Sequence, residues 1–169
     1  MSAQHTHRKG LKHAAADDAQ RVLERVERTC RLRGQRVTRQ RRAVLQVLLG
    51  AGGALTSYEL LDRLRGAGGR STPAAVYRAL EFWMDSGFVH RMDSTRSFVL
   101  CEHPAGPHPG QLLICRQCGT VIEAEDEAVS EAASRLGSRL NFTLDGGLLE
   151  LTGVCALCCA HGRRPQPAS

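Results

Sequence analysis

The chain has 169 residues, of which 42% are hydrophobic and 24% are charged, as expected for a globular protein of one large or two small domains. It contains no run of about 18 apolar residues, so no transmembrane helix is expected. Its polar start, MSAQHTHRKG, argues against a secretory signal. We therefore expect a cytoplasmic protein, in which cysteines stay reduced.

The positive charge of the chain is unevenly distributed. Residues 1–90 contain 16 Lys and Arg and 8 Asp and Glu, whereas residues 91–169 contain 7 Lys and Arg and 9 Asp and Glu. The first half is therefore basic and the second slightly acidic. This asymmetry favours a polyanionic partner for the first half, although basic segments are just as often solvated faces.

Three helices are expected near the start of the chain, after a polar tail at 1–16 that we expect to be disordered. Asp17 begins an amphipathic pattern, and a second helix is expected from Thr38. Thr56 and Glu59 have the spacing of a capping box, which begins the third helix.

A fourth helix is followed by two segments typical of β-strands. Thr72 is a suitable N-cap and Pro73 a suitable first helical residue. The segments FVHRM and SFVLC are separated by the polar DSTR, which predicts a hairpin. Helices followed by a hairpin make a winged helix, a helix-turn-helix variant that places the helix before the hairpin in the major groove of DNA. We assign residues 17–101 to this domain.

A second, smaller domain is expected after a linker rich in Pro and Gly at 102–110. In residues 111–162, two strands, a helix and a last strand are expected, and residues 163–169 are expected to be a second disordered tail. The fold class is therefore α+β, with an α/β second domain. So small a domain needs a metal or a partner subunit for stability.

The helix before the hairpin has one apolar and one polar face. Val76, Leu80 and Trp83 fall on one side, Arg78 falls on the other, and Tyr77 lies at the border. An exposed arginine can bind guanine O6 and N7, so Arg78 and Tyr77 are candidate DNA contacts. The alternative is an ordinary surface arginine beside a half-buried tyrosine.

Two CxxC motifs predict a structural zinc site. They provide Cys115 and Cys118, then Cys155 and Cys158. Paired CxxC motifs commonly supply the four thiolates of a tetrahedral zinc site. A thioredoxin-type redox centre is the alternative, but it uses one CxxC at the head of a helix. Cys159 could replace Cys158 as a ligand.

Three segments, RVTRQRRAVL, TPAAVYRALEFWMDSGFVHR and CRQCG, resemble the ferric uptake regulator family over roughly residues 18–160. These proteins are bacterial, metal-sensing, DNA-binding repressors with an N-terminal winged helix and a C-terminal dimerisation domain. The resemblance implies a homodimer that binds a double-stranded DNA operator and no membrane.

The ligands expected for a second, regulatory site resemble those of the zinc uptake regulator branch. Iron sensors of the family usually carry HxH shortly before the first CxxC, whereas here only His108 lies there, and Glu102 and His103 are possible substitutes. The branch pattern implies the ligands His90, Cys101, His108 and Glu123. Nitrogen, sulfur and oxygen donors together suit zinc, which gives two zinc ions per subunit.

The expected function is therefore zinc-responsive repression of zinc-uptake genes, not catalysis. The candidate DNA contacts are Tyr58, Tyr77 and Arg78, with Arg39, Arg41 and Arg42 as candidate phosphate contacts. A regulator that senses iron, manganese or peroxide is the nearest alternative, and a thiol-disulfide oxidoreductase is the alternative of another class. A zinc hydrolase is disfavoured because no HExxH motif is present.

Overall fold

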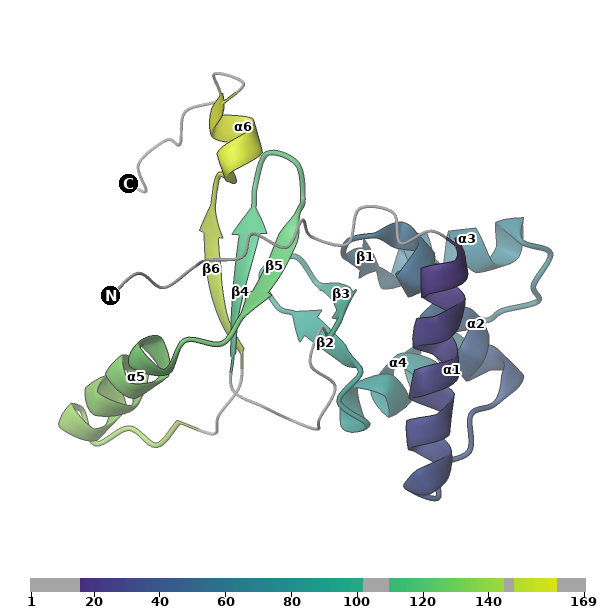
Figure 1. Cartoon of the computed structure of the whole chain (residues 1–169), viewed down its shortest axis with the longest axis horizontal. Coiled ribbons are helices and arrows are strands. Elements are labelled where there is room, and N and C mark those ends of the chain that lie inside the picture. The colour runs from purple at the N-terminus through teal and green to yellow at the C-terminus, as the bar shows by residue number, and fades with distance from the viewer. Residues whose placement is uncertain (1–15, 102–109, 145–147, 161–169) are drawn as a thin grey trace.

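The computed structural model of the chain describes residues 16–101, 110–144 and 148–160. The helices of the N-terminal part lie at one side of the molecule (Figure 1). Of two three-stranded sheets, the one with shorter strands lies next to these helices and the other lies farther away. Within the described ranges, no helix has both the length and the apolar character needed to cross a bilayer.

Four helices form the N-terminal part: α1 (Ala16–Leu32), α2 (Arg39–Ala51), α3 (Ser57–Gly66) and α4 (Pro73–Asp85). Side-chain caps begin three of them. The hydroxyls of Thr38 and Thr72 accept hydrogen bonds from backbone N–H groups in the first turns of α2 and α4, and Thr56 and Glu59 form a complete capping box on α3. The starts expected for the second, third and fourth helices are confirmed, whereas α1 begins at Ala16, one residue before the expected start and inside the tail expected at 1–16.

These helices enclose a continuous apolar core. Each helix contributes a side chain that is almost completely inaccessible to solvent, in chain order Leu23, Leu45, Leu60 and Trp83. The indole Nε1–H of Trp83 donates a hydrogen bond of 2.9 Å to the carbonyl oxygen of Arg41, so its polar atom is satisfied inside the core. The apolar face predicted for the fourth helix is the buried one.

The first sheet contains the predicted hairpin, β2 (Val89–Met92) and β3 (Ser97–Leu100), which we call the wing. A third strand, β1 (Leu55–Thr56), pairs with β3 to give the order β1-β3-β2. Strand β1 was not expected from the sequence, because two residues are too few to show an alternating pattern.

The second sheet has the order β5-β4-β6, with β4 (Gly110–Cys115), β5 (Val121–Ala124) and β6 (Leu148–Gly153). Strand β4 is antiparallel to β5 and parallel to β6. A parallel pair needs a crossover connection, and α5 (Glu127–Arg139), capped by Asp126, lies within that connection.

Three residues form one row across the second sheet. Glu123 of β5 pairs with Leu112 of β4, which in turn pairs with Glu150 of β6. Paired residues of neighbouring strands project from the same face of a sheet. Leu112 is fully buried in an apolar cluster that contains Met92 of the wing. This face of the second sheet is therefore packed against the wing.

Candidate metal centres and nucleic-acid interface

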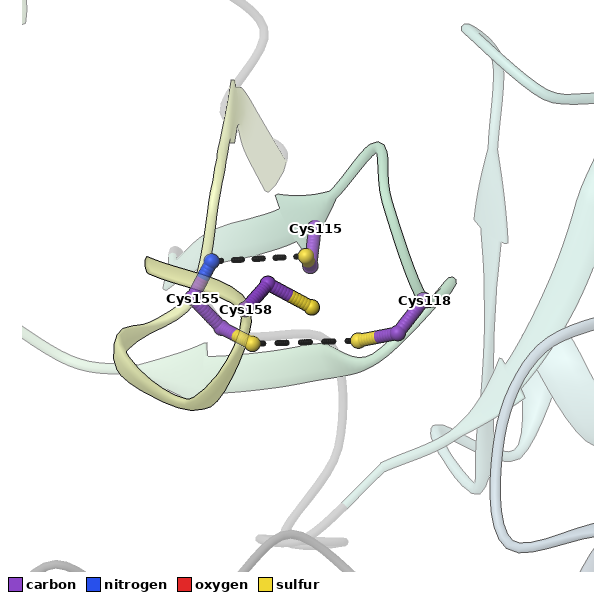
Figure 2. Close-up of side chains that lie close together, drawn as sticks. All are labelled: Cys115, Cys118, Cys155 and Cys158. Atoms are coloured by element: carbon purple, nitrogen blue, oxygen red, sulfur yellow. Dashed lines mark hydrogen bonds between the residues drawn. The ribbon is translucent and has the colours of Figure 1, made fainter. Parts of the chain in front are cut away.

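The four cysteines of the CxxC motifs lie together at one end of the second sheet. Their sulfur atoms point toward one another and all lie within 4.8 Å (Figure 2). Cys115 ends β4 and Cys118 lies in the following turn, whereas Cys155 and Cys158 lie beside and within the short helix α6 (Ala156–Ala160). Helix α6 was not expected from the sequence.

Backbone groups shape the first CxxC turn around the sulfur atoms. The N–H of Gly119 donates to the carbonyl of Cys115 at 2.8 Å, and Gly119 has a φ of +69°, a left-handed conformation that favours glycine. The N–H of Cys155 donates to the sulfur of Cys115 at 3.3 Å. The second motif therefore contacts the first directly, although 40 residues separate the two atoms.

The electrostatics of the four sulfur atoms favour a bound cation. Hydrogen bonds from backbone N–H groups, that of Cys155 first, lower the pKa of Cys115 to about 6. Burial and the neighbouring sulfur atoms raise the pKa of Cys158 to about 12. Several thiolates repel one another at this distance, and a divalent cation among them removes the repulsion. The donor set fits zinc, which prefers four thiolates in a closed tetrahedral site.

Cys159 lies outside this group of four. Its side chain is exposed and its sulfur lies 3.7 Å from the carbonyl oxygen of Val154. The structure therefore brings Cys158, and not Cys159, to the other three sulfur atoms.

A second cluster joins the wing to the second sheet. His90 of β2 places Nε2 3.0 Å from Oε1 of Glu123 on β5, and the sulfur of Cys101 lies 3.7 Å from the same oxygen. The side chains of His90 and Glu123 are only 11% and 3% exposed. A carboxylate at this depth requires polar partners or a cation. These three residues are the second group in the described ranges that could hold a metal ion.

Backbone pairing brings Cys101 to this cluster. Its N–H donates to the carbonyl of Phe88 at 3.0 Å, which extends the wing pairing by one residue beyond β3. His108, the fourth expected ligand, lies outside the described residues, as do the possible substitutes Glu102 and His103. The geometry of three of the four expected ligands is therefore defined.

The candidate DNA contacts lie on the outer surface of the helical part. Arg78 is exposed on α4, Tyr58 is 78% exposed on α3, and Tyr77 is half-exposed. The hydroxyl of Tyr77 is 2.9 Å from that of Ser57, a hydrogen bond that holds the ring against α3. Ser57 could not be identified from the sequence, because its contact with Tyr77 depends on the packing of α3 beside α4.

The three candidate phosphate contacts have different surroundings. Arg41 donates to the carbonyl of Arg36 at 2.6 Å and lies over the Phe82 ring, and Arg42 forms an ion pair with Glu27. Arg39 is exposed at the start of α2. A surface hollow lies between α2 and α4, and its lining residues include Thr38, Arg41 and Arg78. A cationic hollow of this kind suits a phosphate group.

Glu150 is a further polar residue with a contact that the sequence did not predict. Its carboxylate accepts hydrogen bonds from the backbone N–H groups of Asp93 and Ser94, at the turn of the wing. The available signal was a single acidic residue within the apolar strand LLELTG, which by itself does not identify a partner.

Comparison with known proteins finds a family model and relatives that match most of the chain. The sequence model of the Ferric uptake regulator family matches residues 32–152. A relative named Zinc uptake regulation protein, from Escherichia coli K12, is 38% identical over 153 residues, which cover 87% of this chain and 90% of the relative. A protein of the same name from Mycobacterium tuberculosis H37Rv is 30% identical over 125 residues, 74% of this chain and 95% of the relative.

Solved structures show the same fold. A zinc uptake regulator complexed with zinc and DNA has a TM-score of 0.79 at 38% identity, over 85% of this chain and 97% of the other. Holo XcZur has a TM-score of 0.75 at 39% identity, over 83% of this chain and 98% of the XcZur chain. Apo XcZur, also 39% identical, has a TM-score of 0.51 over 85% of this chain and 99% of the XcZur chain. The present arrangement therefore resembles the holo form more closely than the apo form.

Proposed function

The chain belongs to the ferric uptake regulator family, whose members regulate transcription and are not enzymes, and on this premise we propose that it represses zinc-uptake genes when zinc is abundant. In this proposal it acts in the cytoplasm as a homodimer with two zinc ions per subunit. Residues 17–101 bind operator DNA and 111–162 carry the dimer contact. The linker expected at 102–110 lies outside the described residues except for Gly110, which is the first residue of β4.

The first zinc ion is assigned to Cys115, Cys118, Cys155 and Cys158. Bound there, zinc supplies a cross-link whose binding free energy adds to the stability of the fold. The four thiolates complete a tetrahedral set, so no position remains for a catalytic water. The ligands tie the end of β4 to the segment after β6, which is why we assign them a structural role.

The second zinc ion is assigned to His90, Cys101 and Glu123, with His108 as the fourth ligand. The single observation that carries the proposal is that these residues come from both sheets, with His90 on β2 and Glu123 on β5. Ligands drawn from both sides hold the wing against the second sheet when a cation joins them. The thiolate favours zinc over harder cations.

The closer match to holo XcZur supports this mechanism. We infer that the described arrangement is the one that binds DNA, and that the wing separates from the second sheet when the regulatory site is empty. A metal shifts this equilibrium only through its greater affinity for the closed arrangement, so operator DNA must strengthen metal binding by the same factor.

An exposed apolar surface supports the homodimer. On the face of the second sheet away from the wing, Leu113, Leu149 and Leu151 are each 43% exposed. Leu136 and Phe142, at the end of α5 and just after it, are also exposed. Apolar surface of this kind marks an interface between subunits. A second copy on this face would leave α4 of each subunit accessible to its own half-site.

We assign base recognition to Arg78, Tyr77 and Tyr58, and phosphate contacts to Arg39, Arg41 and Arg42. The similarity in fold to a zinc uptake regulator that was solved in complex with zinc and DNA supports a DNA interface on this chain. Since Arg42 pairs with Glu27 and Arg41 stacks on Phe82, a phosphate would have to compete with these contacts.

Replacing one thiol tests the regulatory site. Cys101→Ser should abolish zinc-dependent operator binding yet retain the dimer and the four-cysteine zinc, because Cys101 lies at the other site. Operator binding is titrated against buffered free zinc, with iron and manganese as competing candidates and Cys159→Ser as the matched control. A normal zinc response in Cys101→Ser, or a response to iron or manganese alone, would contradict the proposal.

A further inference from the structure

Glu150 joins the two sheets at a point outside both metal centres. Its Oε1 accepts a hydrogen bond of 2.5 Å from the N–H of Asp93, and its Oε2 accepts one of 3.1 Å from the N–H of Ser94. Asp93 and Ser94 are the first two residues of the turn that connects β2 to β3. One carboxylate therefore caps two consecutive amides of the wing turn.

The wing crosses the second sheet along the row of Glu123, Leu112 and Glu150. At one end of the row, His90 contacts Glu123. In the middle, Met92, two residues along β2, shares an apolar cluster with Leu112. At the other end, the turn contacts Glu150. The apolar contact therefore lies between two polar attachments, only one of which contains candidate metal ligands.

The attachment at Glu150 is a charged one. Burial raises the pKa of Glu150, but hydrogen bonds from Ser94 and Asp93 outweigh that effect and hold the pKa below its ordinary value. The carboxylate is therefore ionised at neutral pH. Hydrogen bonds from amides to a carboxylate are stronger than those between neutral groups.

We propose that Glu150 is a positioning residue that clasps the wing turn to the second sheet and thereby sets the zinc concentration at which the regulator closes. This inference rests on the proposed function. The clasp stabilises the closed arrangement whether or not the cluster at His90 binds a metal. Because apparent affinity for a ligand scales with the fraction of protein in the competent state, a stronger clasp lowers the zinc concentration required.

Two substitutions and a matched control test the clasp. Glu150→Gln removes the charge and Glu150→Ala removes both hydrogen bonds, whereas Glu131→Gln changes a carboxylate on α5 that pairs with Arg135. In operator titrations over buffered free zinc, Glu150→Ala should raise the midpoint about tenfold and Glu150→Gln by less. Saturating zinc should restore operator affinity to within about twofold, because excess ligand recovers the closed state.

Hydrogen exchange provides a readout that does not involve DNA. The amides of Asp93 and Ser94 should exchange faster in both Glu150 variants than in wild type, at low and at saturating free zinc. Amides within α4 should be unchanged, and zinc bound by the four cysteines should be retained. Glu131→Gln should match wild type in every measurement.

Separate outcomes distinguish this inference from the proposed function. Unchanged exchange at Asp93 and Ser94, or a zinc midpoint in both Glu150 variants no higher than in Glu131→Gln, would overturn the clasp. A loss of operator affinity that saturating zinc does not restore would also overturn the positioning role. A wild-type protein that binds the operator regardless of zinc would overturn the proposed function, while the exchange measurement would still judge the clasp.

Discussion

The two halves of the chain are stabilised by different means. The helical half buries a continuous core around Trp83, whereas among the described residues after 109 the only buried hydrophobic ones are Leu112, Ile114 and Cys115. Leu112 and Ile114 share their cluster with Met92 of the wing. The second half therefore depends on contacts outside its own small core, namely the packing of its four cysteines and of the wing, and on the second subunit that we propose.

The largest expected effect is the loss of one sulfur from the four-cysteine group. Structural zinc contributes about 10–16 kcal/mol of apparent binding free energy in small domains, so Cys118→Ser should unfold the second half. Hydrogen exchange should show rapid exchange in β4 and β6, while the helical core stays protected. Cys159→Ser is the control. Equal protection of β4 in both variants would contradict the structural role of the group.

The next largest effect is expected in the other half of the chain, where Trp83→Ala removes the side chain at the centre of the helical core. Trp83→Ala should lower the free energy of unfolding of the first half by about 3–5 kcal/mol, because it leaves a cavity and removes the hydrogen bond to Arg41. Urea unfolding followed by circular dichroism measures this loss. Leu32→Ala, at a side chain that is 84% exposed, should change the stability little. Comparable losses in the two variants would mean that Trp83 is not central to the core.

A third substitution tests whether DNA recognition belongs to the helical half alone. Arg78→Ala should reduce discrimination between operator and unrelated DNA by about 1–3 kcal/mol, because a guanine contact carries sequence information. Discrimination is measured as the ratio of the dissociation constants for operator and unrelated DNA. Arg135→Ala, on α5, should leave it unchanged. A uniform loss on both DNAs would make Arg78 a phosphate contact.

The smallest expected effect concerns the capping box of α3. Hydrogen bonds with the backbone and hydroxyl of Thr56 lower the pKa of Glu59, so its contribution to stability is present above its unfolded-state pKa and is lost as the pH falls through the lower folded-state pKa. Glu59→Ala should cost about 0.5–1 kcal/mol at neutral pH. The difference from wild type should shrink in acid, as thermal unfolding would show. Glu81→Ala, on the exposed face of α4, provides the comparison.

Local elements could be predicted because their signals are local. The Thr38, Thr56 and Thr72 caps act over three residues, so sequence spacing identifies them directly. The face of α4 that contains Trp83 follows from helical periodicity. Strand β1 and helix α6 could not be predicted in this way because each is too short to show a period.

The candidate metal sites could likewise be predicted from the sequence only in part. The spacing of the CxxC motifs indicated four thiolates, but only the packing of α6 brings Cys158 rather than Cys159 to the other sulfur atoms. Three expected regulatory ligands, His90, Cys101 and Glu123, lie together, although no pattern within either half required that they meet. Their proximity results from the wing lying across the second sheet.

The sequence by itself determined helices α1 to α5, the hairpin and the four-cysteine motif, because hydrogen bonds and periodicity within a few residues specify each of them. Only the tertiary structure decided that Glu123 and Glu150 occupy one row and contact the two ends of the wing strand. Contacts between residues more than 30 positions apart depend on strand register and on the packing of two sheets. Those contacts form only when both sheets have folded and packed against each other.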